Sequence, residues 1–137
     1  MQIPAVADAL HVKPGVGGMR YQKGPMTFSG NLLPLYASLM KKYRILIYSG
    51  DTDACVPTWG TVDWIDSLNL TVTKPWRPWV SSHLDGAEGV QRAGYVKDFA
   101  YNFTFATVQG AGHLVPTYKP HFALTMISKW LLGKPLA

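Results

Sequence analysis

The stretch "YRILIYSG" (43–50) constrains the fold more than any other part of the chain. Its centre, "ILIY" (45–48), is a continuous run of aliphatic and aromatic residues, which is typical of a strand buried on both faces in a parallel sheet. A polar loop, "DTDACVP" (51–57), follows it, and "TWGTVDWIDSL" (58–68) then has the apolar spacing of an amphipathic helix. Its inward residues are expected to be Val62, Ile65 and Leu68. A strand, a loop and a helix in this order indicate an α/β fold.

The sequence before this strand predicts two helices separated by a loop. Residues 4–12 have helical spacing, whereas 13–25 is rich in Gly and Pro and is expected to be irregular. Helical spacing returns at 31–42, where Pro34 fits the first turn. The apolar side of this helix is predicted to consist of Leu32, Leu35, Tyr36 and Leu39.

The sequence after residue 69 predicts a hairpin, a further strand and a closing helix. Residues 70–100 contain two short strands around the polar turn "SSHLDGAEG", and a tight turn near Tyr101 and Asn102 leads into a strand at 102–109. The helix at 119–135 is expected to end at Gly133 and Pro135. Its predicted core residues are Phe122, Met126, Ile127, Trp130 and Leu131. With 137 residues and no visible boundary, the chain is expected to form part of one domain.

The charge pattern does not favour a nucleic-acid or membrane partner. The formal net charge is +5, but the 13 Lys and Arg residues are scattered along the chain without interleaved aromatic residues. There is no apolar run of about 18 residues that could span a membrane. The one cysteine, Cys55, cannot form a disulfide within the chain.

Two polar loops lie where functional groups collect in α/β sheets, at the carboxyl ends of strands. One is 50–57 and the other is 110–117, which contains His113. A histidine that acts as a base needs a carboxylate to hold its tautomer, and Asp51 and Asp53 are both candidates. A lone histidine after a strand is more often structural or solvent-facing, and Gly-Asp after a strand is often only a turn. The order Asp then His, however, is that of the α/β-hydrolase triad, in which the serine comes earlier.

The two loops also carry a family resemblance. "YSGDTDACVP" (48–57) and "TVQGAGHLVPTYKP" (107–120) resemble the Asp and His signatures of the serine carboxypeptidases, the family of cathepsin A and of the yeast and cereal enzymes. The resemblance extends over nearly the whole chain and implies an α/β-hydrolase fold. It implies that His113 is the catalytic base and Asp53 the triad acid. Asp51 is then expected to shape the loop by bonding backbone amides.

The same resemblance suggests roles for residues near this pair. Leu114 matches a position that lines the pocket for the departing C-terminal residue, so we expect a preference for hydrophobic C-terminal residues. Cys55 matches a position where some members have a thiol near the site. The alternative for Cys55 is a small buried hydrophobic residue. The family implies a lysosomal, vacuolar or secreted setting, which agrees with N-glycosylation sequons at Asn69 and Asn102.

The nucleophile is the missing part of this resemblance. No Gly-x-Ser-x-Gly motif occurs in the chain, so it resembles the C-terminal part of the enzyme and is expected to be inactive alone. It would be a truncated product or one chain of a cleaved enzyme, and Met1 favours the first. Its expected partners are the missing N-terminal part and peptides with a free C-terminal carboxylate. An unpaired strand edge would also favour association between copies.

Two other functions remain open at this stage. One is an acyltransferase on the same scaffold, in which another alcohol replaces water. The other is a non-catalytic fragment that binds and stabilises partner proteins. The mechanism requires no metal or cofactor, and the chain has no Cys/His cluster with metal-ligand spacing. The remaining histidines are expected to be peripheral: His11, His83 and His121.

Overall fold

A computed structural model describes residues 32–82 and 89–137. The predicted helix at 4–12, the predicted loop at 13–25 and most of the hairpin turn lie outside the described residues. Whether the chain has an internal domain boundary therefore stays a prediction.

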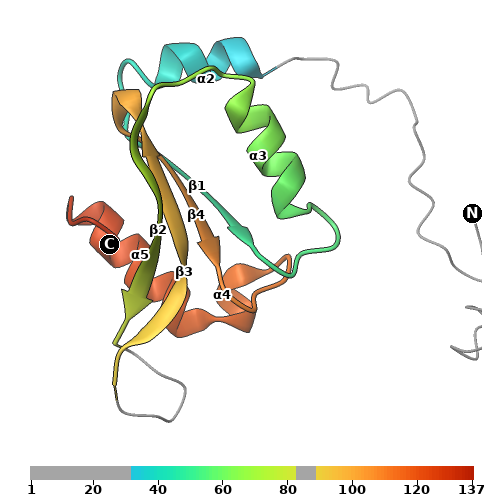
Figure 1. Ribbon diagram of the computed structural model, residues 1–137, viewed down its shortest axis with the longest axis vertical. Helices are drawn as coiled ribbons and strands as arrows, with labels where there is room; N and C mark the ends of the chain where they lie inside the picture. The colour runs from blue at the N-terminus through green and yellow to red at the C-terminus, as the bar shows by residue number, and fades with distance from the viewer. Residues whose placement is uncertain (1–31, 83–88) are drawn as a thin grey trace, which may run out of the picture. The chain divides into compact units, whose positions relative to one another are not determined.

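The order of elements agrees with the sequence prediction (Figure 1). Helix, strand, helix, hairpin, strand and closing helix follow one another, and short helical turns flank the last strand. In chain order the elements are α2 (Leu33–Leu39), β1 (Ile45–Gly50), α3 (Thr58–Asp66), β2 (Val72–Ser81), β3 (Gln91–Phe99), a 3₁₀ turn (Ala100–Asn102), β4 (Phe103–Val108), α4 (Val115–Tyr118) and α5 (Pro120–Leu131).

The strands form one mixed sheet in the order β1-β4-β3-β2. Strands β1 and β4 are parallel, and Gly50 lies opposite Val108. The two other pairs, β3 with β4 and β2 with β3, are antiparallel because the chain reverses directly between them. Tyr101 and Asn102 make the reversal before β4 with φ angles of 61° and 55°, so the predicted tight turn is confirmed. Helices flank this sheet, as expected for an incomplete α/β fold.

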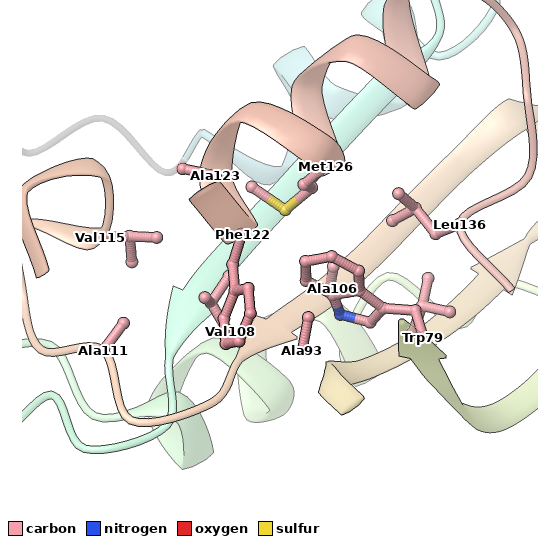
Figure 2. Close-up of a cluster of buried hydrophobic side chains, with 11 residues drawn as sticks. Trp79, Ala93, Ala106, Val108, Ala111, Val115, Phe122, Ala123, Met126 and Leu136 are labelled. Atoms are coloured by element: carbon pink, nitrogen blue, oxygen red, sulfur yellow. The ribbon is translucent and has the colours of Figure 1, made fainter. Parts of the chain in front are cut away.

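One hydrophobic core fills the space between the sheet and α5 (Figure 2). Val108 and Ala106 of β4 are fully buried there and pack with Phe122 and Met126 of α5. Trp79 of β2 is also fully buried, and its indole N–H donates to the Thr107 carbonyl at 2.9 Å. This bond satisfies the polar atom of a large core side chain, so burial carries no unpaired donor.

The opposite face of the sheet carries a second core beneath α2 and α3. Phe103 and Phe105 of β4 point to this side because successive strand residues alternate between faces. Ile65 of α3 is buried against them, and Val62 and Leu68 pack at the margin, as predicted. Strand β4 is therefore buried on both faces, which gives the histidine loop that follows it a rigid origin.

Several burial predictions were wrong for α2 and α5. Leu32 and Leu35 are 60% and 50% exposed, whereas Tyr36 packs against the core as predicted, together with Met40, which was not predicted. In α5, Phe122 and Met126 are buried as predicted, but Ile127 and Leu131 are 39% and 62% exposed. Among the described residues no element covers that side of α5 completely.

Strand β1 also differs from the prediction. It is an edge strand of the described sheet and pairs only with β4. Ser49 and Gly50 are buried, but Tyr48 is 45% exposed and Ile45 to Ile47 are partly buried. The expected burial on both faces is therefore incomplete, since Tyr48 lines a cavity beside α5 that no described residue fills.

Candidate active site

The two polar loops begin side by side, as predicted. Because β1 and β4 are parallel and Gly50 faces Val108, both strands end at the same edge of the sheet. The Asp51 N–H donates to the Val108 carbonyl at 3.1 Å. The Asp51 carboxylate in turn accepts a 2.7 Å bond from the Gly110 N–H. Asp51 thus bonds a backbone amide, the contact that the sequence suggested for it.

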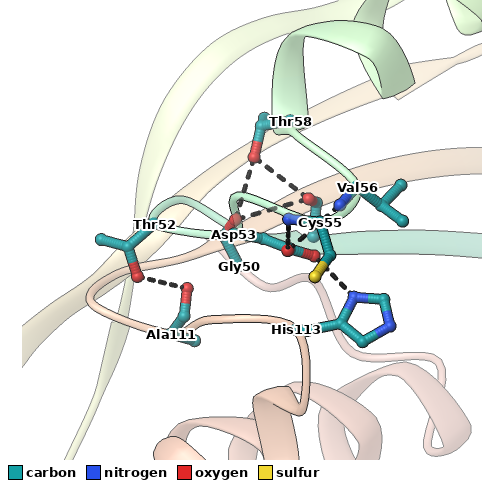
Figure 3. A network of polar contacts seen from close by, with 9 residues as sticks. Gly50, Thr52, Asp53, Cys55, Val56, Thr58, Ala111 and His113 are labelled. Atoms are coloured by element: carbon teal, nitrogen blue, oxygen red, sulfur yellow. Dashed lines mark hydrogen bonds and ion pairs between the residues drawn. The ribbon is translucent and has the colours of Figure 1, made fainter. Parts of the chain in front are cut away.

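Thr52 and Gly50 bring the loops into direct contact. The Thr52 N–H and hydroxyl both donate to the Ala111 carbonyl, at 3.1 and 2.8 Å (Figure 3). The approach is so close that a Cβ on Gly50 would lie 2.2 Å from the same oxygen. Gly110 in the histidine loop adopts a left-handed φ of 66°, but the glycine that allows the close contact is Gly50.

Asp53 and His113 meet at the end of these loops. His113 Nδ1 lies 2.9 Å from Asp53 Oδ2 (Figure 3). The other carboxylate oxygen, Oδ1, accepts bonds from the Cys55 N–H at 2.7 Å and the Val56 N–H at 3.1 Å. Both oxygens are therefore fixed, and the Asp53 side chain is only 7% exposed.

These contacts lower the pKa of Asp53 below its ordinary value of 3.8. The hydrogen bond with His113 makes the largest contribution. Desolvation acts in the opposite direction, and the Val56 and Cys55 amides lower the pKa further. Bonds to the charged form favour it, so Asp53 is a carboxylate at neutral pH.

His113 presents its second ring nitrogen outwards. Its side chain is 55% exposed, and Nε2 has no hydrogen-bond partner among residues 32–82 and 89–137. A cavity of about 170 Å³ adjoins the pair. Its lining consists of Tyr48, Ser49, Gly50, Asp53, Val56, Thr61, His113 and Val115. An imidazole anchored through Nδ1 by a carboxylate, with Nε2 accessible, has the geometry of a general base.

The other predicted site residues lie around this pair. Leu114 follows His113 and is 57% exposed. Cys55 is exposed, which contradicts the alternative of a buried hydrophobic residue, and its amide holds Asp53. His121 is exposed at the start of α5, whereas His11 and His83 lie outside the described residues.

Neither a metal centre nor a membrane span was found in the part of the chain that the structure describes. No group of three or more His, Cys, Asp or Glu side chains there is placed to hold a metal ion. None of the helices within 32–82 and 89–137 combines the length and the apolar character needed to cross a membrane.

Gly50 and Thr52 are parts of the site that were not predicted from the sequence. Their roles depend on contacts with Ala111, about 60 residues later in the chain. A Thr between two Asp residues has no specific signal of its own, because small polar residues are ordinary in loops.

A carboxylate and an imidazole in contact at the ends of neighbouring parallel strands, in the order Asp then His, have the arrangement of two members of a Ser-His-Asp triad. Comparison with known proteins gives the family. The sequence profile of the family described as serine carboxypeptidase matches residues 1–133. The chain belongs to the serine carboxypeptidase family, which confirms the resemblance and the α/β-hydrolase fold expected from it.

Individual relatives agree with this assignment. The chain is 38% identical over 139 residues to serine carboxypeptidase-like 20 of Arabidopsis thaliana, covering 97% of this chain and 27% of the relative. It is 39% identical over 109 residues to serine carboxypeptidase 1 of Hordeum vulgare, covering 79% and 20%. Serine carboxypeptidase-like 17 of Arabidopsis thaliana is 46% identical over 94 residues, covering 69% and 20%. The chain thus spans about a quarter or less of the length of these relatives.

Proposed function

We propose that this chain supplies the acid and the base of a serine carboxypeptidase that removes C-terminal amino acids from peptides. The observation that carries the proposal is the 2.9 Å contact between His113 Nδ1 and Asp53 Oδ2, with His113 Nε2 exposed. The serine would come from an upstream part of the enzyme, since none of the serines in this chain stands in a Gly-x-Ser-x-Gly motif.

The proposed reaction is acyl transfer through a covalent intermediate. His113 Nε2 takes the proton from the serine hydroxyl as its oxygen attacks the last peptide bond. Asp53 holds the imidazole in the correct tautomer and stabilises the imidazolium. His113 then protonates the departing amino acid, and water repeats the cycle on the acyl-enzyme. The exposed Leu114 beside the base supports a preference for hydrophobic C-terminal residues.

Apolar surface beside the site supports an upstream partner. A cavity of about 340 Å³ lies between β1 and α5. Tyr48, Leu124 and Ile127 contribute to its wall and are 45%, 58% and 39% exposed. Together with the open edge of β1, this surface suits the docking of further strands and helices, because exposed apolar patches and strand edges mark interaction sites. We infer that the upstream part of the enzyme covers it and that the chain alone is inactive.

The position of the two sequons supports a secreted, lysosomal or vacuolar glycoprotein. Asn69 follows α3, and Asn102 lies in the turn before β4; both are exposed with φ angles of 50° and 55°. The Ala100 N–H bonds the Thr71 carbonyl at 2.8 Å, so the two turns adjoin at the end of the sheet opposite the Asp–His pair. Glycans there would leave the site open. A mobility shift after N-glycosidase treatment, absent in the Asn69→Gln/Asn102→Gln double variant, checks this inference.

The function is tested by assaying release of the last residue from an N-blocked dipeptide, with the chain alone and with the upstream part present. We expect activity only in the second case. Replacing Asp53 by Asn in the active form should lower kcat by about four orders of magnitude, because the imidazole loses its orienting carboxylate. Hydrolysis by the pure chain, or near-normal turnover of D53N, would refute the proposal. An ester product formed only when an alcohol is added would indicate an acyltransferase instead.

A further inference from the structure

Three hydrogen bonds join the aspartate loop to the histidine loop before the Asp53–His113 contact is reached. The Gly110 N–H donates to Asp51 Oδ1 at 2.7 Å. The other two end on the Ala111 carbonyl, which accepts from the Thr52 N–H at 3.1 Å and from the Thr52 hydroxyl at 2.8 Å. We call these three contacts the loop clamp. Each of them ends on a backbone atom of the histidine loop, and two of the three use a side chain of the aspartate loop.

The residues of the loop clamp lie next to Asp53 and His113 in the sequence, so the clamp controls how far apart these two side chains lie. Thr52 directly precedes Asp53, and Ala111 lies two residues before His113. Ala111 is fully buried, so its carbonyl has a fixed position. The loops already touch, since a Cβ on Gly50 would lie 2.2 Å from the Ala111 oxygen. A change in the clamp must therefore alter the distance between Asp53 and His113.

The hydrogen bond to Asp53 alone does little to fix the orientation of the His113 ring. The His113 side chain is 55% exposed and has one hydrogen bond to the rest of the described chain. A single bond at an exposed position contributes modestly and leaves the ring free to rotate out of line. The orientation of His113 must therefore come largely from the backbone that carries it.

We propose that Thr52 is a positioning residue, whose hydroxyl holds the Ala111 carbonyl and thereby sets the distance between Asp53 Oδ2 and His113 Nδ1. Thr52 does not touch the reacting atoms. Its effect on turnover rests on the proposed function, whereas its effect on the Asp53–His113 hydrogen bond does not.

The test compares Thr52→Val, which keeps the shape but removes the hydroxyl, with Thr52→Ser, which keeps the hydroxyl. Both are made in the complete enzyme, and Thr73→Val is the control because Thr73 is exposed on β2 and outside the clamp. We expect T52V to lower kcat roughly tenfold to hundredfold with KM within about twofold, since small misplacements of catalytic groups act mainly on the chemical step. T52S and T73V should keep kcat within about twofold of the wild type.

The second readout is the Nδ1 proton of His113, observed by NMR in protein labelled with ¹⁵N-histidine. The hydrogen-bonded proton should resonate far downfield in the wild type and T52S, and should move upfield or broaden in T52V. An unchanged resonance and kcat in T52V would overturn the proposal, as would equal losses in T52V and T52S. A wild type that hydrolyses no peptide would refute the proposed function, but the resonance comparison would still decide the role of Thr52.

A second pair of variants covers the case in which T52V does not fold. Asp51→Asn keeps an oxygen that can accept from the Gly110 N–H, and Asp51→Ala does not. If the clamp positions the pair, D51A should lose the downfield resonance and D51N should retain it. Equal spectra for the two variants would show that the Asp51–Gly110 bond is dispensable. Thr52→Ala, which removes the hydroxyl with a smaller side chain than Val, is therefore measured beside them, and an unchanged downfield resonance in T52A would overturn the proposal.

Discussion

Replacing Gly50 by Ala should separate the two loops that carry Asp53 and His113. An ideal Cβ at this position lies 2.2 Å from the Ala111 oxygen and 2.5 Å from the Gly112 oxygen. Real Cβ atoms essentially never approach another atom within 3.0 Å. The Ala111 carbonyl must therefore retreat by at least about 0.8 Å, which is the difference between 2.2 and 3.0 Å.

The expected loss in the free energy of unfolding follows from the two hydrogen bonds that the Ala111 carbonyl accepts. A retreat of this size stretches both Thr52 bonds, now 3.1 and 2.8 Å, beyond good hydrogen-bond length. Overpacking costs about 1–3 kcal/mol, and each lost bond costs about 0.5–1.5 kcal/mol. We therefore expect the free energy of unfolding to fall by about 2–6 kcal/mol. If His113 moves with the loop, kcat should also fall by about a hundredfold.

The assay is urea unfolding followed by fluorescence and circular dichroism, together with kcat in the complete enzyme. Gly60→Ala is the matched control, because Gly60 is exposed in α3 and nothing lies within 4 Å of its Cβ position. This control should stabilise the protein by roughly 0.5–1 kcal/mol, since Ala is the better helix former. If G50A unfolds at the same urea concentration as the wild type and keeps its kcat, the close contact between the loops is not a constraint.

Two further predictions concern acid stability and association. Since the pKa of Asp53 is lowered in the folded state, its stabilisation is present above the unfolded value of about 3.9 and is lost as the pH falls through the folded pKa. The melting temperatures of wild type and Asp53→Asn should therefore converge on acidification below about pH 4, and a constant difference would contradict this reasoning. Leu124→Glu should weaken self-association of the chain, or its binding to the upstream part, about tenfold by sedimentation, because a half-exposed Leu loses about 1–2 kcal/mol of burial. Leu132→Glu, exposed but outside the cavity, is the control, and equal effects of the two would argue against a specific surface.

The sequence predicted the order of elements because its periodicities are strong where packing is two-sided. Strand β4 alternates cleanly, with Phe103 and Phe105 on one face and Ala106 and Val108 on the other. That the two polar loops meet was also predictable, since parallel strands bring their carboxyl ends together. The choice of Asp53 over Asp51 as the partner of His113 came from the family resemblance and not from the strand pattern.

The predictions from the sequence failed in two cases: where no described element packs on an apolar residue, and where a residue's contact lies far away in the chain. Tyr48, Ile127 and Leu131 were predicted to be buried from their apolar character, but no described element covers them. Periodicity shows which residues share a face, but it does not show whether another element packs there. Gly50 and Thr52 were missed for the second reason, because their role depends on a carbonyl about 60 residues away.

The pairing of β1 with β4 explains how Asp53 and His113 can meet in a chain that lacks the proposed serine nucleophile. Asp53 and His113 follow adjacent strands that pair directly, and the loop clamp joins the loops with three hydrogen bonds that need no residue from elsewhere. The Asp53 side chain is well held, but the strand before it is the less supported of the two, since β1 is an edge strand of the described sheet whereas β4, before His113, is paired on both sides. A strand added to the open edge of β1 would therefore restrain Asp53 directly. Docking of the upstream part would then supply the serine and rigidify the carboxylate in one step, so the active site and the apolar surface beside it depend on the same contact.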